Sequence, residues 1–95
     1  MNRVSTIGAI EGGGSFLVSW RLAGKRVLIV GGGKLATSRV RLILAADANV
    51  YVVSPILGAE LRRRAQTGEI EWVPRRFEDA DIADADMVLA ATDES

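Results

Sequence analysis

The fold of this chain is decided by residues 26–36, which read RVLIVGGGKLA. An uninterrupted apolar run, typical of a strand buried on both faces of a parallel sheet, passes directly into glycines and then into a helical pattern. Gly31, Gly33 and Ala36 fit G-x-G-x-x-G/A, the fingerprint of a dinucleotide-binding turn. Gly31 would permit the tight turn, and Ala36 would let the helix pack closely against the strand. Gly33 would let the backbone approach a pyrophosphate at the helix N-terminus, where N–H groups attract anions.

Downstream of this turn, strand patterns alternate with helical patterns. From Lys34 to Ala46 the apolar residues recur at helical spacing. We expect further strands at 50–53, 70–73 and 87–91, a second helix at 56–67 that ends before Gly68, and a short helix within 77–85 with Phe77 and Ile82 facing inward.

This alternation predicts an α/β fold with a parallel sheet and right-handed helical crossovers. The chain would form a truncated Rossmann-like sheet, β-α-β-α-β-α-β, with strand order 3-2-1-4 and an N-terminal arm. Residues 1–23 are interpreted as a leader in which 16–20 could add an edge strand. The glycines at 12–14 are interpreted as coil, because a phosphate loop would end in Gly-Lys-Ser/Thr. Residues 24–95 are interpreted as a partial NAD(P)-binding Rossmann domain.

Composition narrows the chemistry that these residues can perform. The 95 residues carry 12 basic and 12 acidic side chains and no formal net charge, which argues against nucleic acid or a membrane surface as a partner. Neither cysteine nor histidine is present, so disulfides, Cys/His zinc sites and His-dependent triads are excluded. No catalytic residue and no metal ligand is assigned. No apolar run reaches ~18 residues and no signal-peptide pattern is present, so we expect a cytoplasmic protein.

Ligands of open α/β sheets bind outside the carboxyl ends of the strands, where the strand order reverses. Three segments should meet there. We expect them to bind the cofactor through Gly31, Gly32, Gly33, Lys34 and Leu35 at the turn, Ser54, Pro55 and Ile56 beside the adenosine ribose, and Thr92 after the last strand. The Lys34 side chain could neutralise pyrophosphate charge or could point into water.

The end of the second expected strand departs from the usual fingerprint. Most NAD-binding Rossmann domains place Asp or Glu there to accept hydrogen bonds from the ribose hydroxyls, whereas this chain has Ser54. An uncharged hydroxyl would bind the ribose more weakly, and it would not repel a 2′-phosphate. The choice between NAD and NADP therefore stays open. The arginines at 62–64 could approach a 2′-phosphate or could form a solvated helix face.

Three stretches resemble the siroheme synthase family. They read WRLAGKRVLIVGGG at 20–33, ANVYVVSP at 48–55 and VLAATD at 88–93, and the leader GGSFLVSW at 13–20 is similar to the fungal bifunctional members. The resemblance implies an NAD-dependent precorrin-2 dehydrogenase of siroheme biosynthesis, an oxidoreductase in which hydride passes to NAD. It also implies a tetrapyrrole substrate, a homodimer and, in some members, a ferrochelatase activity that inserts iron.

In that family, the aspartate held responsible for both reactions lies after a fifth strand, beyond the last residue of this chain. The resemblance thus implies that these residues form the cofactor-binding part of such an enzyme, which binds NAD, with NADP left open. Two alternatives are a non-catalytic NAD(P)-binding or nucleotide-binding module and a structural remnant whose sheet serves only for assembly.

Overall fold

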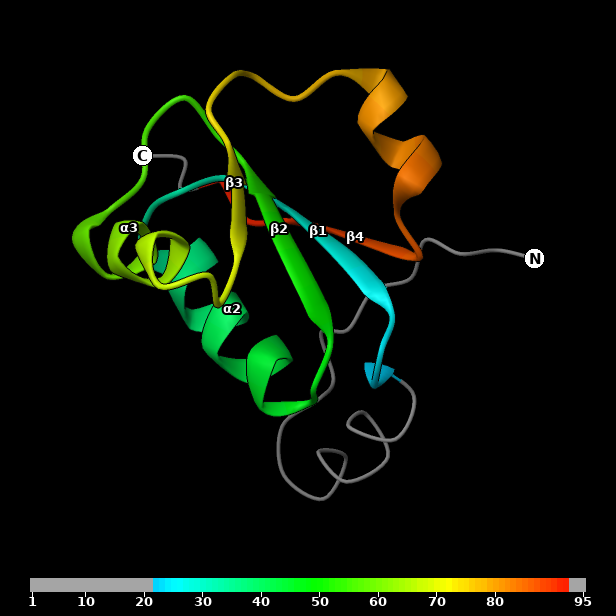
Figure 1. The fold of residues 1–95 in the computed structure, drawn as a ribbon. Helices are drawn as coiled ribbons and strands as arrows, with labels where there is room; N and C mark the ends of the chain where they lie inside the picture. The colour runs from blue at the N-terminus through cyan, green and yellow to red at the C-terminus, as the bar shows by residue number, and fades with distance from the viewer. Residues whose placement is uncertain (1–21, 93–95) are drawn as a thin grey trace.

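The computed structural model describes residues 22–92. The expected arm at 16–20, most of the expected leader and residues 93–95 lie outside this range. Strands and helices alternate along the chain as predicted (Figure 1). In order they are β1 (Arg26–Val30), α2 (Lys34–Ala45), β2 (Asn49–Val53), α3 (Ala59–Gln66), β3 (Glu71–Val73), the 3₁₀ helix η2 (Asp79–Asp84) and β4 (Met87–Ala90).

The four strands form one parallel sheet in the order β3-β2-β1-β4. This confirms the predicted topology, including the reversal of strand order between β1 and β4. Helices α2 and α3 cover one face of the sheet, where Val40 and Leu61 pack into the same buried cluster as Ile29. The opposite face carries a smaller cluster around Leu28 and Tyr51, against which residues next to η2 pack.

Strand β1 is the centre of the molecule. Val27, Leu28 and Ile29 are each fully buried, although successive side chains point to opposite faces. Both faces of β1 are therefore covered, and this is why its sequence is continuously apolar rather than alternating.

Helix α3 begins later than its sequence pattern predicts. The expected start at residue 56 was wrong, because the loop 54–58 has an extended course held by contacts to distant segments. Gly58 is the N-cap residue, and its N–H donates a hydrogen bond to the Gly32 carbonyl at 2.9 Å. The predicted end is confirmed: Gly68 has φ +85°, and its N–H and that of Glu69 bond back to carbonyls of the last turn.

One prediction for the segment between β3 and β4 was wrong. Phe77 packs against the smaller cluster as predicted, but Ile82 is 41% exposed rather than inward-facing. Asp81 takes the inward position in η2: its carbonyl accepts a hydrogen bond from the Tyr51 hydroxyl at 3.3 Å, and its carboxylate is held by Arg75 at 2.9 Å. The neighbouring Ile82 is turned outward as a result. Within residues 22–92, no helix is long and apolar enough to span a membrane.

Candidate functional site

The glycine turn after β1 is packed tightly against the chain that follows β4. Gly31 has φ +126°, a conformation that side chains rarely adopt, and a Cβ atom there would overlap the carbonyl oxygen of Ala91. The Gly31 N–H donates to the Val53 carbonyl at 3.1 Å, and the Ala91 N–H donates to the Val30 carbonyl at 2.8 Å. Gly31 therefore joins the ends of β1, β2 and β4 at one edge of the sheet.

Gly32 has a role that the fingerprint did not reveal, because it occupies an unspecified position of that pattern. A Cβ atom on Gly32 would overlap the Ile56 carbonyl oxygen and would lie 2.9 Å from the Ser54 hydroxyl. Its own carbonyl accepts the hydrogen bond from the Gly58 N–H. Gly32 thus lets the loop 54–58 pack directly on the turn. The glycine at this unspecified middle position of the run 31–33 was the signal that could have indicated this contact.

Gly33 differs from the two glycines before it. It is exposed and is the N-cap residue of α2, with φ −97° and no side chain over the helix end. The first turn of α2 contains no acidic residue, and the N–H groups of a first helical turn have no intrahelical acceptor. These N–H groups can therefore bind an anion, and the positive end of the helix dipole strengthens that attraction. An exposed backbone with these properties fits a diphosphate, and Gly33 is the glycine to which the fingerprint assigns that contact.

Lys34 and Leu35 follow in the first turn, and both side chains are exposed. Lys34 lines an open hollow of about 450 Å³ between the beginnings of α2 and α3. Its other lining residues are Gly33, Thr37, Ser38, Arg41, Gly58 and Ala59. The Arg41 guanidinium in this hollow is paired with Glu60 of α3 through bonds of 2.7 and 3.0 Å.

Ser54 ties the loop after β2 together. The side chain is buried, and its hydroxyl donates to the Ile56 carbonyl at 2.7 Å and accepts from the Ile56 N–H at 3.4 Å. The Ser54 carbonyl accepts a bond from the Trp72 indole N–H at 2.8 Å. Because the hydroxyl hydrogen is already used, Ser54 could meet a ribose only as an acceptor. Its contact with a ribose stays a prediction.

The other expected binding residues lie at the same edge of the sheet. Pro55 and Thr92 are exposed, and the Ile56 side chain is 75% exposed. The glycine turn, the loop after β2 and the chain after β4 therefore come together, while the binding of a cofactor by their residues remains a prediction. Within residues 22–92, no group of three or more acidic side chains is placed to hold a metal ion.

Ion pairs around Glu60 of α3 compensate part of the charge near this edge. The hydrogen bond from Arg41 lowers the pKa of the Glu60 carboxyl from its usual 4.5 to about 2, and Arg64 lowers it further in the same direction. Arg64 also pairs with Glu69. Glu60 is therefore an ionised carboxylate whose charge is balanced by two guanidinium groups.

Comparison with known proteins identifies the family. Residues 18–95 match the family model described as "Putative NAD(P)-binding". The siroheme biosynthesis protein met8 of Schizosaccharomyces pombe is 45% identical over 89 residues, which are 90% of this chain and 34% of that protein. Siroheme synthase 1 of Aeromonas salmonicida is 47% identical over 73 residues, covering 77% of this chain and 16% of that protein.

Among solved structures, the precorrin-2 dehydrogenase SirC matches with a TM-score of 0.72 and 30% identity. The match covers 77% of this chain and 37% of SirC. The resemblance to siroheme synthases and the Rossmann-like fold, both predicted from the sequence, are thereby confirmed. The chain spans about a third or less of the length of the two curated relatives described. Because the family model covers most of its residues, the chain belongs to this family of NAD(P)-binding domains.

Proposed function

We propose that this chain binds NAD and is the cofactor-binding part of a precorrin-2 dehydrogenase of siroheme biosynthesis. The observation that carries the proposal is the exposed Gly33 at the N-terminus of α2, in a helix whose first turn has no acidic residue. The printed names of the relatives support the reaction, and the matched family supports a nicotinamide cofactor.

In this proposal each segment of the site has a distinct task. Gly33, Lys34 and Leu35 hold the diphosphate with backbone N–H groups and one cationic side chain. Ser54, Pro55 and Ile56 border the adenosine ribose, and Thr92 borders the adenine or the central part of the cofactor. Gly31 and Gly32 keep these segments in contact, since a side chain at either position would push them apart. The bound nicotinamide would supply the hydride acceptor.

The complete reaction needs more protein than these residues. A tetrapyrrole substrate and a homodimeric assembly are proposed for a longer protein that contains this chain, because the curated relatives described extend well beyond the matched region. Oxidation of precorrin-2 by such a protein, followed by the appearance of NADH, would test this part. A protein that binds NAD but never forms NADH from precorrin-2 would favour the non-catalytic module instead.

Binding itself can be tested on the chain alone by titration with NADH, followed by nicotinamide fluorescence. Gly33→Val should raise the dissociation constant at least about tenfold, because a branched side chain blocks approach of the diphosphate to the backbone. Ala45→Val is the matched control, since it adds the same side chain at the far end of α2. Equal affinities of the Gly33 variant and the parent chain would contradict the proposal, provided that circular dichroism shows both to be folded.

A further inference from the structure

The three consecutive arginines of α3 have different surroundings. Arg64 donates hydrogen bonds to Glu60 at 3.2 Å and to Glu69. Arg63 is exposed in the last turn of the helix. Arg62 lines an open hollow of about 540 Å³ between α3 and β3. Only Arg62 of the three therefore lines this hollow.

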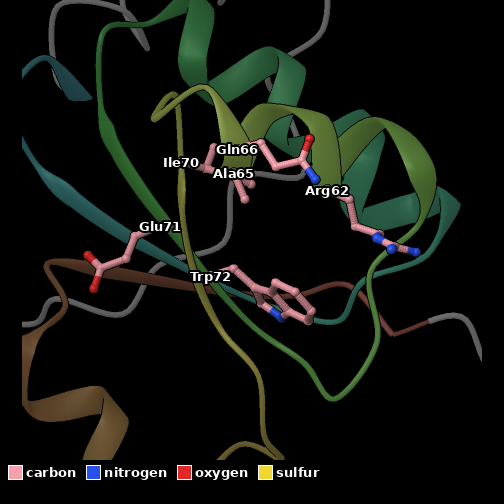
Figure 2. A pocket seen from close by; sticks show the side chains of 6 residues that line it. All are labelled: Arg62, Ala65, Gln66, Ile70, Glu71 and Trp72. Carbon is pink, nitrogen blue, oxygen red and sulfur yellow. The ribbon is translucent and has the colours of Figure 1, made fainter.

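This hollow lies beside the edge strand β3, whose residues Glu71 and Trp72 pair with Tyr51 and Val52 of β2. Its lining residues are Arg62, Ala65, Gln66, Ile70, Glu71 and Trp72 (Figure 2). The Trp72 indole N–H is bonded to the carbonyl of Ser54, the residue that directly follows β2. Figure 2 shows Arg62 and Trp72 on the same side of β3, while the Glu71 carboxylate points to the other side of the strand. Arg62 thus lies on the side of β3 that carries Trp72, and Trp72 is bonded to the residue after β2, where a Rossmann domain holds the adenosine ribose.

Little negative charge stands near the end of β2 to repel a phosphate, and the acidic lining residue Glu71 points its carboxylate to the other side of β3 (Figure 2). The loop 54–58 contains no acidic residue. The first acidic residue after β2 is Glu60, and its carboxylate is held by Arg41 and Arg64. Rossmann domains that reject NADP use a carboxylate at the end of β2, whereas those that accept it place an arginine nearby.

We propose that Arg62 binds the 2′-phosphate of NADP, so that the site accepts NADP as well as NAD. The inference rests on the proposed function, because it requires the adenosine end of the cofactor to lie at the end of β2. A guanidinium group is suited to this task, since its planar donors match the oxygens of a phosphate and it stays charged at every physiological pH.

The test compares NADPH with NADH on the full chain, each titrated by nicotinamide fluorescence at low ionic strength. The parent chain should bind both. Arg62→Ala should raise the dissociation constant for NADPH about tenfold and change that for NADH less than about twofold. Arg62→Lys should recover part of the loss. Arg63→Ala is the matched control, because it removes the same charge from the neighbouring position, and it should leave the ratio of the two constants unchanged.

A second probe isolates the phosphate itself. Adenosine 2′,5′-bisphosphate should displace NADPH from the parent chain more effectively than 5′-AMP, and Arg62→Ala should remove this difference. The inference is overturned if NADH binds and NADPH does not, or if the Arg62 and Arg63 variants behave alike. Failure of both nucleotides to bind overturns the proposed function and this inference with it, so the two failures are distinguishable.

Discussion

At the scale of single residues, the turns of this chain depend on backbone conformations that most side chains avoid. Asp47 has φ +63° at the end of α2, where its N–H bonds to the Leu44 carbonyl at 2.9 Å. Its own carbonyl accepts a bond from the Gly24 N–H at 3.0 Å, which fastens the end of α2 to the start of the described chain. The left-handed conformation is energetically unfavourable for L-residues, and Asp tolerates it better than most.

Asp47→Gly should therefore stabilise the chain by roughly 0.5–1 kcal/mol, because glycine adopts this conformation without strain. Asp47→Val should destabilise it by at least a similar amount, since branched side chains tolerate the left-handed region poorly. Urea unfolding followed by circular dichroism would measure both. A glycine variant less stable than the parent chain would show that interactions of the Asp47 side chain stabilise the fold by more than the backbone strain at this position destabilises it.

The glycine turn provides a second prediction at this scale. Gly32→Ala should destabilise the fold by roughly 1–3 kcal/mol, because its Cβ atom would overlap the Ile56 carbonyl and displace the loop 54–58. Gly33→Ala should cost less than about 1 kcal/mol, because Gly33 has a negative φ and is exposed. Urea unfolding midpoints of the two variants, compared with that of the parent chain, would test these two losses of stability. Equal losses would mean that Gly33 also has a packing role.

At the scale of elements, ion pairs join α2 to α3 and hold the segment around η2. Glu60 bridges Arg41 of α2 and Arg64 of α3. Asp81 of η2 is held by Arg75, whose hydrogen bonds lower the pKa of its carboxyl from 3.8 to about 2, and the Glu78 N–H bonds to the same carboxylate at 2.7 Å. These contacts lie at the surface, so they orient the elements more than they stabilise the whole fold.

The lowered pKa values predict how stability depends on pH. Both carboxyls have a lower pKa in the folded chain than when unfolded, so their stabilising contribution is present above about pH 4.5 and is lost as the pH falls toward about 2. Glu60→Gln should flatten this acid dependence, measured as urea midpoints across that range. Glu71→Gln, at an exposed carboxylate that forms no ion pair within residues 22–92, should leave the profile unchanged. Identical profiles for all three proteins would contradict the ion-pair assignment.

At the scale of the whole molecule, the sheet is covered unequally on its two faces. The larger cluster combines α2, α3 and one face of every strand, whereas the buried members of the opposite cluster are Leu28, Tyr51 and Val53. A domain of this size depends strongly on each large buried side chain, because its net stability is a small difference between large terms.

Leu28→Ala should accordingly destabilise the chain by about 2–5 kcal/mol, a large part of the stability of a small domain. Leu42→Ala is the matched control: the same atoms are removed from a side chain that is 36% exposed on α2, and the change should stay below about 1 kcal/mol. Thermal unfolding of the three proteins would test this. Similar losses at both positions would show that the smaller cluster contributes little.

The sequence by itself determined the elements and their order. The apolar run of β1 and the helical spacing of α2 are local patterns, and right-handed crossovers convert their alternation into one sheet order. The glycine fingerprint likewise lies within a few neighbouring residues, so the location of the candidate site could be predicted from the sequence. Local signals of this kind do not depend on how distant segments meet.

Only the tertiary structure decided the features that arise where distant segments touch. The late start of α3, the packing role of Gly32 and the buried hydroxyl of Ser54 all follow from the loop 54–58 resting on the glycine turn. Tertiary contacts likewise decide that Ile82 faces outward and that Arg62 lines a hollow that its two neighbouring arginines do not line. The physical reason is that hydrogen bonds and steric exclusion act between residues far apart in the chain, and no local periodicity encodes which of them come into contact.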